Sequence, residues 1–349
     1  MSVYTNALRF WNEFKQQQEI LKKALIQQDY PTLETLIDGL NEMVTRDTGC
    51  HLIVEYAYEA FELSFDTGPN KTSQYLASYF VSMAPDEVRS QWIINACLPP
   101  LSQKAVQTEV RIKENVYYLN DFTVFYQVDT KNQMFICHLY CPGYTLIDVE
   151  ERKTEMSMYL IELAVGQTAY ESYIADIDFL DQPDPAHAFC NLIELYDVIM
   201  DRVESEGWKA YRSPLDIYSV YQPNQDIVHD SLRKDMKLIF TTHPLLIEES
   251  LENQTDTVSD LQAKGGKYIY MYYVHPFEGK ENALFRQNLA KRLSSEMQHL
   301  HIGQVIGGAI GKSYGYIDWI IYDESRFESA FQNIKKQFES QVKLYYQPF

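Results

Sequence analysis

A glycine-rich segment, Gly307–Ser313, comes within one residue of a phosphate-binding loop. Such a loop needs four residues between its first glycine and the Gly-Lys-Ser/Thr triplet. Gly307 and Gly311 enclose only three. A phosphate-binding loop also opens a helix, whereas Gly315–Tyr322 has the composition of a strand. We therefore interpret the segment as a β-hairpin with glycines at its bend, and we expect no nucleotide to bind there.

The segment Cys137–Cys141 combines cysteine and histidine, which are metal-ligating residue types. Its spacing differs from that of a zinc Cys-x2-Cys knuckle and from that of a haem-attachment motif. In a strand the two cysteines would share a face about 13 Å apart, at about 3.3 Å per residue, which is too far for one zinc ion. We predict no metal ion and no cofactor, and we interpret the cysteines as core residues.

Four aspartates lie close together in and after a strand predicted at 172–180. The first two share a strand face and the others follow in a loop. The segment lacks the central glycine and closing glutamate of a helix-loop-helix calcium site, so we predict an acidic patch at an exposed strand edge, where charge discourages pairing. A loose divalent-cation site is the alternative. The aspartates are Asp176, Asp178, Asp181 and Asp184.

Two histidines, His243 and His275, each precede a proline at the end of a predicted strand, where catalytic residues often lie. The sequence has no Gly-x-Ser-x-Gly elbow, and nothing local pairs a cysteine with a histidine. We therefore assign no catalytic residue. The absence of a catalytic motif favours a protein without enzymatic activity. The alternative is a hydrolase-type enzyme whose fold brings these histidines and the acidic patch together.

The net charge of −19 is unevenly distributed along the chain. Residues 1–139 hold 17 acidic and 11 basic residues, residues 140–264 hold 24 and 9, and residues 265–349 hold 8 and 10. Nucleic-acid binding needs Lys and Arg to neutralise phosphates, so we predict no nucleic-acid partner. A basic protein surface would be attracted to the middle segment, although acidic surface also serves solubility alone.

Composition indicates a globular protein in a reducing compartment. Hydrophobic residues make up 46% of 349 residues, enough for a substantial core and more than one domain. The N-terminal residues lack a signal-peptide pattern, and no apolar run reaches the roughly 18 residues of a membrane span. The five cysteines are an odd number and mostly far apart. We expect a cytoplasmic protein with no disulfide framework and no membrane partner.

Hydrophobic periodicity predicts an α+β fold in four segments. An N-terminal region, 1–118, has the order α-α-β-β-α-β. Two modules, 119–208 and 265–349, have the order β-α-β-β-α of a ferredoxin-like α/β sandwich with an antiparallel sheet. An irregular connector, 209–264, joins them. Whether the two modules share one extended sheet stays open. Helices are expected to include 10–25, 33–44, 75–83, 150–165, 190–206 and 282–300, and to follow Pro244 and Asp323; strands are expected at 52–56, 61–65, 91–97, 122–128, 134–140, 172–180, 236–241, 267–274, 302–309 and 314–322.

The last segment also carries a family resemblance. A helix, then Gly303-Gln304, then a hairpin into Tyr316-Ile317-Asp318 and a final helix resemble ferredoxin-like domains of uncharacterised bacterial proteins, including the group around the inhibitor of ribonuclease E. The resemblance covers about 80 of the 349 residues, and no functional residue is carried over from it. It implies a binding or inhibitory role more than catalysis.

Together these observations predict an acidic binding or regulatory protein of the immunity or inhibitor type that engages a basic protein partner. The alternatives are the hydrolase-type enzyme described above and a structural, self-assembling module. The sequence leaves the oligomeric state open.

Overall fold

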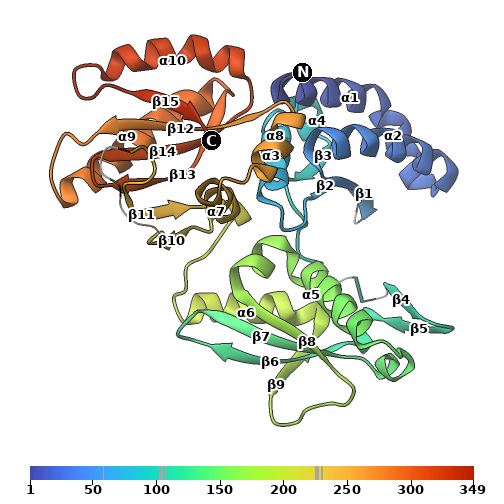
Figure 1. Ribbon diagram of the computed structural model, residues 1–349. Coiled ribbons are helices and arrows are strands. Elements are labelled where there is room, and N and C mark those ends of the chain that lie inside the picture. The colour runs from blue at the N-terminus through green and yellow to red at the C-terminus, as the bar shows by residue number, and fades with distance from the viewer. Residues whose placement is uncertain (58, 102–104, 107, 225–227, 229–230) are drawn as a thin grey trace. The chain divides into compact units, whose positions relative to one another are not determined.

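The computed structural model describes residues 1–57, 59–101, 105–106, 108–224, 228 and 231–349. The fold is of the α+β class that the sequence predicts, with helices and several antiparallel sheets (Figure 1). The chain forms two compact units, and the four-segment division stays a prediction. Unit 1 contains Met1–Phe61, Asn70–Trp92 and Tyr218–Phe349, and unit 2 contains Glu62–Pro69 and Ile93–Ile217.

Unit 1 opens with two helices, as predicted, and the break between them falls at Gln28 and Asp29. The side chain of Asp29 accepts a hydrogen bond from the backbone N–H of Thr32 and caps the second helix. Pro31 lies in the first turn of that helix, where its missing N–H costs no helical hydrogen bond. The indole N–H of Trp11 donates to the carbonyl oxygen of Phe80 at 2.7 Å and connects the first helix to the third. These helices are α1 (Val3–Gln27), α2 (Tyr30–Thr48), α3 (Lys71–Ser82) and the short α4 (Asp86–Arg89).

A three-stranded sheet has the order β1-β2-β3, and its strands and the preceding helices follow the predicted order of elements. A further hairpin, β4 and β5, was not predicted. Its turn falls at Lys113 and Glu114, which carry no glycine or asparagine signal although Lys113 adopts a φ of 54°. The strands are β1 (His51–Ala57), β2 (Ala60–Asp66), β3 (Trp92–Asn95), β4 (Glu109–Ile112) and β5 (Asn115–Tyr118).

Unit 1 holds a six-stranded sheet within the described residues, in the order β10-β11-β13-β14-β12-β15 with antiparallel neighbours throughout. Strands β12 to β15 and their helices follow the chain order strand, helix, strand, strand, helix, strand. Strands β10 and β11 extend the sheet beyond β13, so part of the predicted connector is packed into this sheet. Residues 225–227 and 229–230 of that connector lie outside the described residues. The strands are β10 (Ser219–Tyr221), β11 (Met236–Thr241), β12 (Lys267–Val274), β13 (Gly303–Gly311), β14 (Tyr314–Ile321) and β15 (Tyr345–Pro348).

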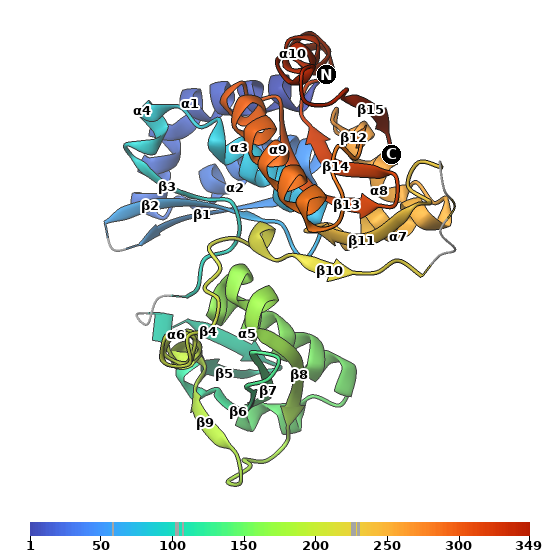
Figure 2. The ribbon, with the colours of Figure 1, turned by 90° about the vertical axis from the view of Figure 1, so that its left-hand side faces the viewer.

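The two faces of this sheet have different coverings. On one face, helices α9 and α10 enclose a core that includes Leu293, Phe331 and Trp319. On the other face, Ile239 and Tyr316 belong to a smaller cluster to which α7 contributes. Figure 2 shows α9 lying across β13 and β14, with which it is in contact. The helices are α7 (Pro244–Glu252), α8 (Asp256–Ala263), α9 (Lys280–His299) and α10 (Glu324–Phe338).

The hairpin of Gly307–Ser313 is confirmed, but its glycines do not form the bend. Strand β13 continues to Gly311, and the turn is made by the two residues before β14. Gly308 lies inside the strand, where an added Cβ would come within 2.2 Å of the Tyr316 carbonyl oxygen and 2.6 Å of a guanidinium nitrogen of Arg286. Close packing on the strand, and not the turn, therefore requires glycine there.

Unit 2 is built on a four-stranded sheet in the order β8-β7-β6-β9, with α5 and α6 packed against one face. Strands β7 and β8 are parallel, so the antiparallel ferredoxin-like sheet predicted for 119–208 is wrong. The helical crossover α5 returns the chain beside β7 in the same direction. These strands share no ladder with β12 to β15 among the described residues, so the modules do not share one sheet. The elements are β6 (Thr123–Asp129), β7 (Met134–Tyr140), α5 (Glu150–Tyr173), β8 (Ile174–Leu180), β9 (Ala188–Asn191) and α6 (Leu195–Ser205).

Two local predictions in unit 2 have different outcomes. Helix α5 is interrupted at Gly166, with φ 72° and ψ 157°, where the sequence predicts a helix end. The helix predicted to start near Cys190 begins later, because Cys190 lies in β9 and pairs with Val124 of β6. The buried thiol of Cys190 belongs to the hydrophobic core beneath α6.

Candidate functional site

Asp176 and Asp178 lie on β8, which pairs only with β7 within the described residues and is an edge of the sheet. Both side chains are exposed. A carboxylate oxygen of Asp176 accepts a hydrogen bond from the backbone N–H of Ile177 at 2.9 Å, and one of Asp178 accepts from Phe179 N–H at 2.8 Å. The two aspartates therefore cover N–H groups that an added strand would need.

Asp181 and Asp184 have local side-chain partners instead, a lysine and a histidine. The Lys153 ammonium lies 2.6 Å from Asp181 and 4.8 Å from the centre of the Phe179 ring, and the Lys153 side chain is almost fully buried. Asp184 accepts hydrogen bonds from Ala186 N–H at 2.9 Å and from His187 Nδ1 at 2.7 Å. These contacts, the backbone bond first, hold the pKa of Asp184 below its ordinary value.

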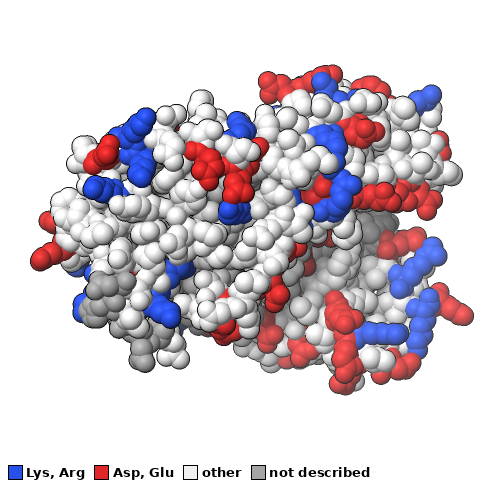
Figure 3. All heavy atoms as spheres, turned by 45° about the horizontal axis from the view of Figure 1, so that its top comes forward, with Lys and Arg blue, Asp and Glu red and all other residues white. Residues whose placement is uncertain are grey.

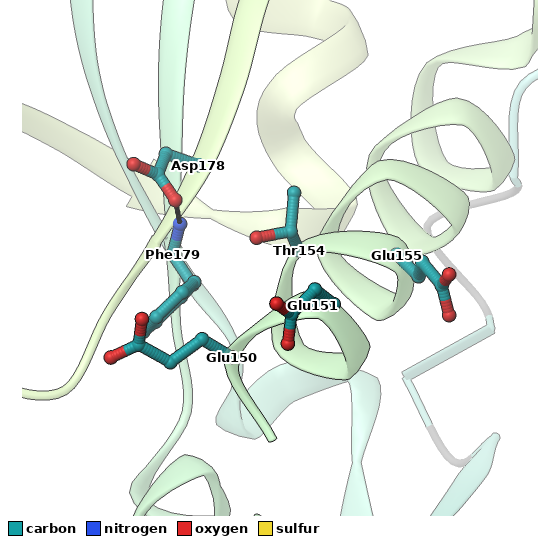
Figure 4. A pocket seen from close by; sticks show the side chains of 6 residues that line it. All are labelled: Glu150, Glu151, Thr154, Glu155, Asp178 and Phe179. Atoms are coloured by element: carbon teal, nitrogen blue, oxygen red, sulfur yellow. Dashed lines mark hydrogen bonds between the residues drawn. The ribbon is translucent and has the colours of Figure 1, made fainter.

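One of the four aspartates, Asp178, lines a pocket of about 530 Å³ between β8 and the first turns of α5. Figure 4 shows Glu150 and Asp178 on the two sides of Phe179, with Glu151 on the facing turn of the helix and the Glu155 carboxylate directed away from β8. The residues that line the pocket are Glu150, Glu151, Thr154, Glu155, Asp178 and Phe179.

The electrostatics of this pocket follow from its two walls. Glu150 and Glu151 lie in the first turn of α5, where the positive end of the helix dipole stabilises carboxylates. Asp178 adds a carboxylate from the facing strand, and none of the described lining residues is basic. The buried Lys153 reaches Asp181 instead. The pocket is therefore a concave surface of like charge that would attract a cationic side chain.

The parallel crossover brings Glu150 and Glu151 beside Asp178, and sequence reasoning missed these glutamates. Two acids at a helix start are equally typical of an ordinary solvated first turn. Only their approach to β8, more than twenty residues later in the chain, makes them part of a pocket.

The histidines of the enzyme alternative are not brought together. His243 is buried, its Nδ1 accepts a hydrogen bond from Leu246 N–H, and burial lowers its pKa to about 4. Its neighbour Thr242 donates its N–H to Ile306 of β13, whereas His275 Nε2 contacts the carbonyl oxygen of Gly311 at 3.1 Å. The two contacts are five residues apart on one strand, or about 16 Å at 3.3 Å per residue. One substrate atom cannot meet both rings.

The cysteine motif and the glycine-rich motif are the two remaining candidates from the sequence. Cys137 and Cys141 are buried, and burial raises the pKa of both thiols, that of Cys141 to about 11. The described residues contain no group of three or more His, Cys, Asp or Glu side chains arranged to hold a metal ion. After Ser313 the chain continues as a strand, which confirms that the segment does not open a helix.

Comparison with known proteins identifies no relative: no family, no curated protein and no solved structure matches the chain. None of the helices in the described part of the chain combines the length and apolar composition that a membrane span requires.

Proposed function

We propose that the chain is a non-enzymatic binding or regulatory protein whose acidic pocket on unit 2 receives a basic segment of a protein partner. The observation that carries this proposal is the pocket itself, in which Glu150 and Glu151 of α5 face Asp178 of β8 without a basic residue among the described lining residues. A Lys or Arg side chain placed there would make charge-assisted hydrogen bonds with several carboxylates at once.

The distribution of charge between the units supports the same proposal. The stretches that form unit 2 hold 22 acidic and 9 basic residues, a net charge of −13 out of the −19 of the chain. On the face of the molecule seen in Figure 3, acidic and basic side chains are interspersed. A partner would therefore be guided by the long-range field of unit 2 but positioned by the pocket.

The finer form of the proposal is an immunity- or inhibitor-type protein of the bacterial cytoplasm that neutralises a basic protein and binds no nucleic acid. For residues 265–349 we propose a ferredoxin-like module, supported by the strand order β13-β14-β12-β15 with antiparallel neighbours. The resemblance of this segment to the group around the ribonuclease E inhibitor supports an inhibitory role.

The test uses a fluorescein-labelled oligoarginine peptide and fluorescence anisotropy with the full chain. We expect binding that weakens as salt is added, since the contacts are ionic. The double variant Glu150→Gln/Glu151→Gln should lower the affinity about tenfold, because two ionic contacts to the same basic segment are lost.

The matched control is Glu114→Gln/Glu204→Gln, which removes the same charge from exposed positions of unit 2 outside the pocket. It should change the affinity less than about twofold through the long-range field alone. If the two double variants weaken binding equally, the pocket has no special role. Binding that is insensitive to salt would contradict the electrostatic proposal.

A further inference from the structure

Arg286 of α9 is a buried cation that forms no ion pair among the described residues, although Asp318 of β14 favours its charge at longer range. Its side chain reaches across to the sheet, only 9% of the residue is exposed, and its guanidinium carbon lies 3.7 Å from the centre of the Phe240 ring. Its one hydrogen bond within the described residues runs from Nη1 to the carbonyl oxygen of Tyr316 at a long 3.4 Å. No carboxylate of the described residues lies within the 4.0 Å of an ion pair.

The fold accommodates this cation, but burying its charge is unfavourable in free energy. Gly308 leaves space for the guanidinium, since a Cβ there would lie 2.6 Å from Nη1. Burial also lowers the pKa of Arg286 to about 10, which shows that the surroundings disfavour its charge. A buried charge is unfavourable unless an opposite charge or several hydrogen bonds compensate it. Within the described residues of the chain, that compensation is incomplete.

Beside Arg286 the sheet presents an apolar margin that none of the described helices covers. In the strand register, Val220 of β10 pairs with Phe240 of β11, and Phe240 pairs with Gly308. Ile239 belongs to the cluster on the opposite face, so Val220, Leu238 and Phe240 point to the face on which α9 lies. Helix α9 contacts β13 and β14, and Val220 and Leu238 remain 62% and 36% exposed.

The uncovered margin has the width of one helix. Two strands at about 4.8 Å spacing span roughly 10 Å, close to the diameter of an α-helix. The side of α9 that faces away from Phe285, which packs on β12, carries the half-buried small residues Ala283 and Ser294. A second helix could therefore lie beside α9 on the same face of the sheet, as helices do in layered α/β structures.

We propose that the margin formed by β10 and β11 is a docking surface for an amphipathic helix of a partner protein, which packs on Val220 and Leu238 and presents a carboxylate to Arg286. The apolar margin recognises the apolar stripe of the helix, and the half-compensated guanidinium recognises its acidic group. The margin is too open to enclose a small molecule, because Val220 and Leu238 remain exposed. Residues 218–349, which include β10, β11 and α9, hold 14 basic and 16 acidic residues, a net charge of −2 against −13 for unit 2, so an acidic helix meets less repulsion here than on unit 2. This surface lies on unit 1 and is independent of the acidic pocket.

The test measures anisotropy with two labelled amphipathic helical peptides that share a leucine stripe at i, i+3, i+4 and i+7 and differ only in one Glu or Gln at its border. Wild-type protein should bind the Glu peptide about tenfold more tightly than the Gln peptide, which is the effect of one charge-assisted hydrogen bond. Arg286→Met should abolish that difference, and Val220→Asp should weaken both peptides.

Thermal unfolding supplies the second measurement. Arg286→Met should melt at or above the wild-type temperature, since an uncompensated buried charge is replaced by an apolar chain of similar length. A clear decrease in melting temperature would show that Arg286 is a structural residue and would overturn the proposal. Equal binding of the two peptides to wild type, or no binding of either, would also overturn it. A concentration-dependent mass that Val220→Asp abolishes would show that a second copy of the chain covers this face, and would overturn the partner helix.

Discussion

The ring of His243 and the backbone of Leu246 form a side-chain cap at the start of α7: His243 Nδ1 accepts the Leu246 N–H at 3.3 Å. With Nδ1 as acceptor, Nε2 carries the proton and donates to the Thr72 hydroxyl at 3.3 Å. The ring also packs edge-on against Tyr268. The neutral imidazole therefore connects α7, α3 and β12, and protonation would remove its only acceptor.

The first prediction concerns acid destabilisation through His243. Burial lowers its folded-state pKa from 6.5 to about 4, so the unfolded chain binds the proton more readily. The stability is fully present above pH 6.5 and is lost as pH falls from 6.5 toward 4. We expect about 2 kcal/mol less free energy of unfolding at pH 5 than at pH 7.5 from this group alone, measured by urea denaturation.

The variant His243→Asn is the control for that measurement, because asparagine can still cap a helix but does not titrate in this range. Its own stability at pH 7.5 will be lower, so the quantity to compare is the change between the two pH values. That change should be about 2 kcal/mol smaller in the variant than in wild type. Equal changes in both proteins would mean that His243 is not the titrating group.

The second prediction concerns the buried carboxylate of Asp235. Its Oδ2 accepts the backbone N–H groups of Ser313 at 2.8 Å and of Tyr314 at 3.0 Å, and its Oδ1 accepts the Tyr316 hydroxyl at 2.5 Å. Asp235→Asn would place an amide nitrogen against one of these donors and should cost about 2 kcal/mol of unfolding free energy. The control Asp256→Asn, at an exposed helix start, should cost less than about 0.5 kcal/mol. A loss below 0.5 kcal/mol for Asp235→Asn would show that the N–H groups of the hairpin turn do not need the carboxylate.

The third prediction compares two glycines. Gly308→Ala should destabilise the protein by about 2 kcal/mol or more, because the new methyl group meets the Tyr316 carbonyl oxygen and the Arg286 guanidinium. Gly39 lies at an exposed position of α2 with open space around it. Gly39→Ala should therefore raise the free energy of unfolding by about 0.5 to 1 kcal/mol. Melting temperatures that move in opposite directions would support the packing argument. A neutral Gly308→Ala would mean that β13 shifts to accept a side chain.

Elements with a strong local signal could be predicted from the sequence. The last helix is expected to follow Asp323 because aspartate is a good N-cap residue, and the Asp323 side chain does accept the Arg326 N–H. Strand β12 was predicted from alternating aromatic and aliphatic residues, which suit a strand buried on both faces. The short edge strands β9 and β15 were missed, since four residues are too few for a periodic pattern.

The candidate site depended on information that no local pattern contains. Asp178 was identified because aspartates cluster near it, but its partners Glu150 and Glu151 gained meaning only through the parallel pairing of β8 with β7. Arg286 gave no signal either, because arginine in a helix is ordinarily exposed. Its burial results from the helix lying over Gly308, a contact between residues 22 positions apart. Tertiary placement, and not residue type, determined both surfaces.

The last prediction concerns the open edge of β8. Asp176→Ala/Asp178→Ala exposes the N–H groups of Ile177 and Phe179 and removes two charges that oppose pairing with another strand. We expect the weight-average mass in sedimentation velocity to rise with concentration more steeply than in wild type. The control Glu114→Ala/Glu204→Ala loses the same charge without uncovering a strand edge, and its mass should follow the wild type. If both variants associate alike, lower net charge is the cause. If neither associates, the aspartates do not protect this edge.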